Sequence, residues 1–125
     1  DYADAVLQKF IAHASVPVLS LESAILHPLQ SFADAMTIRE YQARARPKVV
    51  LTWAPHPRAL PQAVANSFVQ WISRMEVDLV VAHPEGWALS PAFTEGIATT
   101  TDQAEALAGA DFVYAKNISY SFDTW

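Results

Sequence analysis

Short apolar runs of strand length alternate along this chain with longer segments whose apolar residues recur at helical spacing. The runs over 49–53, 77–82 and 111–115 are rich in β-branched and aromatic residues, which favour buried strands. Residues 61–75 carry apolar side chains every three or four positions, which predicts an amphipathic helix. This alternation restricts the chain to the α/β class. We expect a three-layer αβα domain, with a mainly parallel sheet and helices on both faces.

Other segments complete this scheme. Further helices are predicted over 3–14, 91–95 and 103–107, and further strands over 18–21 and 98–101. Another helix is predicted to begin near Pro28, because proline is favoured in the first turn. The stripe of that helix expected to face the core comprises Leu29, Phe32, Ala33 and Met36. Asp102 is a plausible N-cap for the helix that follows it.

The composition excludes several classes of protein. Hydrophobic residues make up 52% of the 125 positions, which is enough for one packed core. The net charge of −5 offers no positive field for nucleic acid, and no apolar run approaches the roughly 20 residues of a membrane span. We therefore expect neither nucleic acid nor membrane as a partner. The absence of cysteine is compatible with a reducing cytoplasm, where we place the protein.

Three of the four histidines precede a proline, namely His27, His56 and His83. His56 and His83 follow predicted strands, and His27 opens a predicted helix. Ligands in open α/β sheets bind beyond the carboxyl ends of the strands, so all three stand where a site would form. For each histidine alone, a structural role in a turn or helix start is the commoner one. No two histidines have the i, i+4 spacing of a helical metal site, and no metal is expected.

Phosphate loops and covalent nucleophiles have no support in this sequence. Gly86, Gly96 and Gly109 are too far apart to form a phosphate-cradling loop. Cysteine is absent, and no serine lies in a nucleophile-elbow pattern. From these residues alone, the chain is an α/β domain of unknown activity.

Three segments resemble the carbamoyltransferase family. Residues 21–34 (LESAILHPLQSFAD) contain the family's His-Pro-x-Gln motif. Residues 51–64 (LTWAPHPRALPQAV) resemble the proline-rich loop of the branch that acts on N-acylated ornithines, where ordinary ornithine carbamoyltransferases have a Ser-Met-Gly loop. Residues 110–117 (ADFVYAKN) match the same branch. The proline-rich loop looks closer to that of the N-succinylornithine enzymes than to that of the N-acetylornithine enzymes, and the resemblance covers essentially the full chain.

The resemblance implies an enzyme of two α/β domains, one for carbamoyl phosphate and one for the amino acid, assembled as a homotrimer with sites between subunits. Residues 1–20 would then end the first domain, and residues 21–125 would form the amino-acid-binding domain, incomplete at its C-terminus. The family's Ser-x-Arg-Thr-Arg phosphate motif and its His-Cys-Leu-Pro segment are absent from this chain. We therefore expect the chain to be a fragment that is inactive alone.

The implied reaction transfers a carbamoyl group from carbamoyl phosphate to the δ-amine of N-succinylornithine or N-acetylornithine, in arginine biosynthesis. It needs no cofactor and no covalent nucleophile, because positioning and oxyanion donors suffice. By resemblance, His27 hydrogen-bonds the carbamoyl oxygen and Gln30 holds the carbamoyl amide. These two are the expected catalytic residues.

The resemblance also implies a set of substrate-binding residues. They are Glu22, His56, Pro57, Arg58 and Lys116. A guanidinium such as that of Arg58 suits bidentate capture of a succinyl carboxylate, and Lys116 would pair with a substrate carboxylate. Without the resemblance, Glu22 and Lys116 would be solvated surface charges. The resemblance gives His83 no role, and we expect it to be a structural turn residue.

Two alternatives remain open at this point. The first is an ordinary ornithine or aspartate carbamoyltransferase, against which the proline-rich loop counts. The second is a non-catalytic α/β ligand-binding domain that keeps the scaffold. A calorimetric titration with N-succinylornithine separates the second from a fragment with half a site, because a binding module would keep its affinity.

Overall fold

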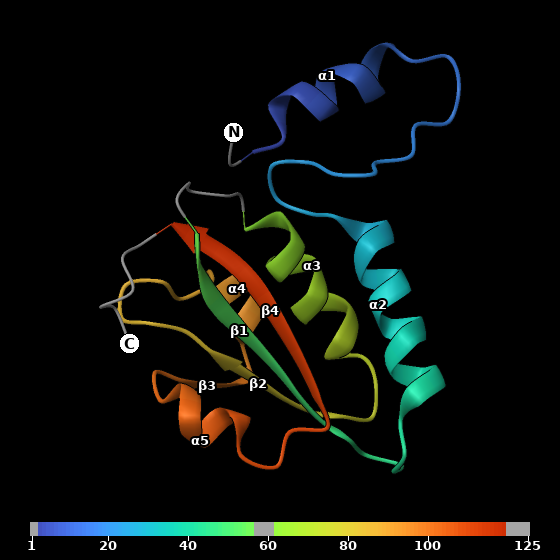
Figure 1. Cartoon of the computed structure of the whole chain (residues 1–125). Coiled ribbons are helices and arrows are strands. Elements are labelled where there is room, and N and C mark those ends of the chain that lie inside the picture. The colour runs from blue at the N-terminus through green and yellow to red at the C-terminus, as the bar shows by residue number, and fades with distance from the viewer. Residues whose placement is uncertain (1–2, 57–61, 120–125) are drawn as a thin grey trace.

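The computed structural model describes residues 3–56 and 62–119, and within them four strands form one sheet (Figure 1). The strands are β1 (Lys48–His56), β2 (Asp78–Ala82), β3 (Ala98–Thr100) and β4 (Phe112–Ser119). All neighbouring strands are parallel, in the order β3-β2-β1-β4. The helices of the described part are α1 (Ala5–His13), α2 (Pro28–Tyr41), α3 (Ala63–Ile72), α4 (Pro91–Thr94) and α5 (Gln103–Leu107).

The alternation of side chains along the central strand β1 creates two cores. Val49, Leu51 and Trp53 belong to the larger core, on the face that α2 and α3 cover. Val50 points to the opposite face and packs with Ala106 of α5. The sheet therefore lies between helices on both faces, and the predicted three-layer αβα fold is confirmed (Figure 1).

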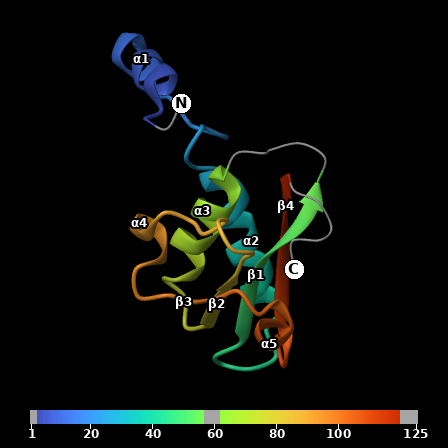
Figure 2. The ribbon, with the colours of Figure 1, turned by 90° about the vertical axis from the view of Figure 1, so that its left-hand side faces the viewer.

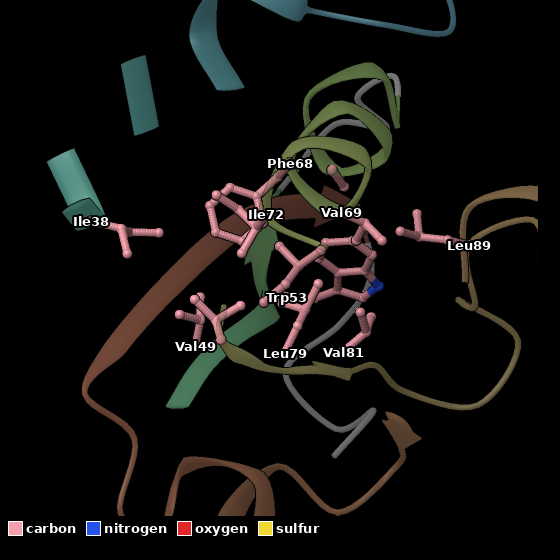
Figure 3. Packing of buried hydrophobic residues seen from close by; sticks show 12 residues of the cluster. Ile38, Val49, Trp53, Phe68, Val69, Ile72, Leu79, Val81 and Leu89 are labelled. Carbon is pink, nitrogen blue, oxygen red and sulfur yellow. The ribbon is translucent and has the colours of Figure 1, made fainter. Parts of the chain in front are cut away.

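The larger core fills the space between the sheet and α3 (Figure 3). Trp53 and Phe68 are the bulkiest of its fully buried side chains, and burying a large apolar side chain contributes about 1.5–3 kcal/mol. The Trp53 indole N–H donates a hydrogen bond to the Trp87 carbonyl at 3.0 Å. This bond holds the segment after β2 against β1 and satisfies the polar atom that a buried tryptophan brings with it.

The smaller core is closed by α5. The predicted N-cap is confirmed, because the Asp102 side chain accepts a hydrogen bond from the Glu105 backbone N–H at 2.9 Å. Gln103 donates from Nε2 to the Thr52 hydroxyl at 2.9 Å, which attaches the helix to the middle of β1.

The stripe predicted to be the buried side of α2 is wrong. Leu29, Phe32 and Met36 are each about half exposed, and the buried positions are Ser31 and Ile38. Phe32 packs against Trp71 of α3, with ring centroids 5.2 Å apart, but 46% of its surface stays exposed. Helical periodicity showed that an apolar stripe exists but not which surface it contacts.

The strand predicted over 18–21 does not form in the structure. A strand needs a partner for its backbone N–H and C=O groups, and no described strand pairs with this segment. The preceding helix α1 has no buried residue, with Val6 63% and Phe10 68% exposed, and it projects away from the sheet (Figures 1 and 2). Among the described helices, none has the length and apolar character needed to cross a membrane.

The two faces of the sheet give a matched test of the packing. Val50 on β1 and Val113 on β4 are register partners on the same face, but Val50 is fully buried and Val113 is 54% exposed. Val50→Ala should lower the free energy of unfolding by about 2 kcal/mol, through lost burial and a cavity. The control Val113→Ala should lower it by roughly 0.5 kcal/mol or less. Urea denaturation measures both, and equal losses would contradict this placement of the smaller core.

Candidate functional site

The order of the strands marks one edge of the sheet as the place for a site. The chain moves outward from β1 to β2 and β3, then returns to place β4 on the other side of β1. Ligands in open α/β sheets bind beyond the carboxyl ends of the strands at such a reversal of order. The carboxyl ends of β1 and β4 lie side by side, with His56 paired to Ser119 (Figure 1). We call this edge the carboxyl edge.

The turn that carries His27 is held at the carboxyl edge by α3. Both α2 and α3 begin at this edge (Figure 1). The His27 backbone N–H donates to the Ser67 hydroxyl at 2.7 Å, and Asn66 donates from Nδ2 to the Ile25 carbonyl at 3.1 Å. Asn66 and Ser67 are buried polar residues on a mainly apolar helix. They bond the turn that precedes α2, whose N-cap has no side-chain hydrogen bond of its own, and fix the backbone on which the site is built.

The His27 ring lies between the surface and the core. Its Nε2 is 3.9 Å from Oε2 of Glu22, a weak contact that is an ion pair only when the histidine is protonated. Its Nδ1 has no hydrogen-bond partner among the described residues. The glutamate is more than half exposed. The arrangement leaves the imidazole with hydrogen-bonding capacity at the N-terminus of α2, where the helix dipole favours negative charge.

Gln30 is one turn further along α2 and is tied to Asp34. Its Nε2 donates to Oδ1 of Asp34 at 2.9 Å. The Tyr114 hydroxyl of β4 lies beside the same carboxylate, and the Tyr114 ring stacks on Phe68 with centroids 4.2 Å apart. Burial raises the pKa of Asp34 above its ordinary value, although the Gln30 hydrogen bond opposes this. Burial, and then the charge of Asp34, raise the pKa of Tyr114 to about 12.

Lys116 was predicted at the end of the last strand, but β4 continues three residues beyond it, and Lys116 is half-buried in register with Trp53. Side chains alternate along a strand, so Lys116 shares a face with Tyr114, which packs against the larger core. That is the face covered by α2 and α3. Lys116 therefore lies on the same side of the sheet as α2, at whose start His27 and Gln30 lie.

Three predicted residues cannot be placed in the same way. The backbone of His56 ends β1 at this edge, but its side chain is outside what the structure describes. Pro57 and Arg58 lie outside the described residues altogether. His83 follows β2, where its N–H donates to the Thr100 carbonyl at 3.0 Å and its Nδ1 lies 2.9 Å from the Pro84 carbonyl oxygen.

No metal centre is formed by the residues that the structure describes, since no three His, Asp or Glu side chains among them are grouped to hold an ion. The chemistry available at the carboxyl edge is that of hydrogen bonding and charge. An imidazole, a primary amide and a lysine ammonium are present together with two carboxylates, those of Glu22 and Asp34. Such a set can orient a small polar substrate and stabilise charge on it.

The residues that support this site were not predicted from the sequence. Asp34 stands four positions after Gln30 and seven after His27, which places it on the same helix face, so spacing could have found it. Ser67 and Tyr114 have no comparable signal. They reach the site from α3 and β4, and only the tertiary fold brings those elements to α2.

Several known proteins are similar to this chain in sequence and fold. No protein-family model matches the chain. It is 52% identical to N-succinylornithine carbamoyltransferase of Bacteroides thetaiotaomicron, over 100% of the chain and 40% of that protein. It is 36% identical to N-acetylornithine carbamoyltransferase of Xanthomonas axonopodis pv. citri, over 94% of the chain and 38% of that protein.

Solved structures agree with these sequence comparisons. The crystal structure of N-acetyl-L-ornithine transcarbamylase superposes with a TM-score of 0.83 at 33% identity, covering 95% of this chain and 40% of that one. A variant of such an enzyme complexed with carbamyl phosphate and N-succinyl-L-norvaline gives a TM-score of 0.85 at 34% identity, covering 94% and 40%.

These similarities extend over essentially the whole chain, so it is similar throughout to one part of the carbamoyltransferases. The identity is higher to the N-succinylornithine carbamoyltransferases than to the N-acetylornithine enzymes. The resemblance inferred from the sequence is thereby confirmed. The chain spans about 40% of the length of these relatives.

The environment of Tyr114 predicts a late phenol ionisation. The unfolded chain loses this proton near the ordinary value of 10.0, whereas the folded chain holds it up to about 12. Stability should therefore fall as the pH rises through this window, because the folded state binds more protons there. Urea midpoints and phenolate absorbance measure both effects. Tyr114→Phe should abolish the late ionisation, and the control Tyr41→Phe, at an exposed site, should retain it. Complete tyrosine ionisation by pH 10.5 in the folded protein would refute the assignment.

Proposed function

We propose that this chain supplies most of the amino-acid-binding domain of an enzyme that transfers a carbamoyl group from carbamoyl phosphate to the δ-amine of N-succinylornithine, in arginine biosynthesis. The observation that carries the proposal is the turn from His27 to Gln30, which the fold holds at the carboxyl edge in a chain 52% identical to N-succinylornithine carbamoyltransferases. N-acetylornithine is the alternative substrate.

The proposed chemistry is an attack of the δ-amine nitrogen on the carbamoyl carbon. A C–N bond forms, a tetrahedral intermediate carries negative charge on oxygen, and the C–O bond to phosphate breaks as a proton of the amine passes to the departing phosphate. His27 hydrogen-bonds the carbamoyl oxygen, and Gln30 holds the carbamoyl amide. The N-terminus of α2, where both residues lie, adds a favourable dipole for the developing charge.

Recognition of the amino acid is assigned to the remaining predicted residues. Lys116 pairs with the substrate carboxylate, and Glu22 lies near the amino-acid moiety. His56, at the end of β1, and the two residues that follow it in sequence, Pro57 and Arg58, also contribute. The half-buried position of Lys116 on the same sheet face as Tyr114 supports its role. The higher identity to the N-succinylornithine enzymes supports a succinyl carboxylate as the partner of Arg58.

The first 20 residues are proposed to end the carbamoyl-phosphate domain, and residues 21–125 to form the amino-acid-binding domain. Apolar side chains left uncovered on α1 and on the following segment support this division, since such surface usually marks a contact. These side chains are Val6, Phe10, Ile11, Val16 and Leu19. In the complete protein they would pack within the first domain. We further propose that the complete protein is a cytoplasmic homotrimer.

The complete protein and the 125-residue chain should differ in activity. Given carbamoyl phosphate and N-succinylornithine, the complete protein should form N-succinylcitrulline, while the chain alone should form none at an enzymatic rate. Gln30→Ala in the complete protein should lower kcat/KM by about 100-fold, as expected for a group that binds the reacting centre. Gln42→Ala makes the same change at the far end of α2 and should leave kcat/KM unchanged. Normal turnover by the chain alone, or an inert Gln30, would contradict the assignment.

Arg58 tests the choice of acyl group. In the complete protein, Arg58→Ala should reduce kcat/KM for N-succinylornithine about tenfold more than for N-acetylornithine, because only the succinyl group carries a second carboxylate. Arg74→Ala, at an exposed position just after α3, is the matched control and should affect neither substrate. Steady-state rates with both substrates decide the question, and equal losses would remove the succinyl assignment.

A further inference from the structure

We propose that Asp34 is a positioning residue that fixes which end of the Gln30 amide faces the ligand. This inference rests on the proposed function of Gln30. Asp34 has no role in the reaction described above, yet its carboxylate is half-buried and is the hydrogen-bond acceptor of the amide that is assigned to the carbamoyl group.

A primary amide has a donor end and an acceptor end, and the two differ little in shape. Rotation about the last side-chain bond exchanges them, and this torsion is broad and nearly two-fold for a free glutamine. An ionised carboxylate only accepts hydrogen bonds. The 2.9 Å contact with Oδ1 of Asp34 therefore selects the orientation in which Nε2 of Gln30 faces Asp34.

This selection leaves Oε1 of Gln30 as the atom presented to a ligand. An oxygen acceptor complements the NH₂ of a carbamoyl group and repels its carbonyl oxygen. His27, three residues earlier at the start of α2, then takes the carbonyl oxygen. His27 and Gln30 thus distinguish the carbonyl oxygen of the carbamoyl group from its NH₂. The carbamoyl carbon is therefore held in one orientation for attack by the amine.

The Asp34 carboxylate is itself held by the sheet. The Tyr114 hydroxyl lies beside it, and the Tyr114 ring is fixed by stacking on Phe68 at 4.2 Å. Tyr114 is also paired in register with Leu51 of the central strand. The orientation of an exposed glutamine on α2 is therefore determined by a strand of the sheet, through one half-buried carboxylate.

If Asp34 only linked α2 to β4, its substitution would affect different ligands equally. Loss of that link would displace α2 and weaken the binding of every ligand at this site. Loss of the amide orientation would weaken only ligands that donate to Oε1. Acetyl phosphate distinguishes the two cases, because a methyl group replaces the NH₂ of carbamoyl phosphate.

The test uses the complete protein and the variants Asp34→Asn and Asp34→Ala. Each should raise the dissociation constant of carbamoyl phosphate about tenfold and leave the inhibition constant of acetyl phosphate within about twofold. Adding Asp34→Ala to Gln30→Ala should cause no further loss, because the two residues act as one unit. Asp78→Asn, at an exposed carboxylate that accepts a hydrogen bond from the exposed Arg46, is the matched control and should change neither constant.

Three outcomes would overturn the inference. Equal weakening of both phosphates would show that Asp34 only maintains the structure. If Asp34→Ala lowered the affinity for carbamoyl phosphate by the same factor in the Gln30→Ala variant as in the protein with Gln30, the carboxylate would act independently of the amide. An unchanged affinity for carbamoyl phosphate in Asp34→Asn, with Gln30→Ala still impaired, would remove Asp34 and leave the proposed function intact. An inert Gln30→Ala variant would instead remove both proposals.

Discussion

The burial of β1 is the constraint on which the rest of this structure depends. The strand has a neighbour on each side and helices over both faces, so every side chain from Val49 to Trp53 is buried. Continuous burial requires parallel neighbours whose connections cross over the sheet as helices. The same geometry brings the carboxyl ends of β1 and β4 together. The hydrophobic core thus determines where a ligand can bind before any polar residue takes part.

Buried polar side chains form a second set of interactions, and these position the residues of the candidate site at the carboxyl edge. Asn66 and Ser67 are buried on α3 and use their side chains to hold the turn before α2. Buried polar groups are costly unless they are paired, so these bonds are enforced by the core that surrounds them. Tyr114 and Asp34 couple α2 to β4 in a similar way. The exposed residues of the site, Glu22 and Gln30, therefore lie on a backbone that is held in place by α3 and β4.

Strands and helices buried on several sides could be predicted from the sequence, and contacts between distant segments could not. The run from Val49 to Trp53 and the Asp102 cap carry local signals, and both were predicted. The buried side of α2 was predicted wrongly, because periodicity does not tell whether an apolar stripe faces this core or another surface. The strand predicted over 18–21 does not form, because no strand of the described residues pairs with it, although its composition is suitable. Tyr114 and Ser67 reach the site only through the order of the strands.

The two failures and the exposed apolar residues have one physical explanation. The stripe of Leu29, Phe32 and Met36 on α2 was predicted to be buried but is about half exposed, and the apolar side chains of α1 are exposed as well. Exposing apolar surface to water costs roughly 25 cal/mol of free energy per Å². Exposed apolar surface of this kind often marks a contact, which is why the same residues support the proposed division of the chain. Helical periodicity thus identifies an apolar surface correctly, but it does not tell whether that surface packs against this core.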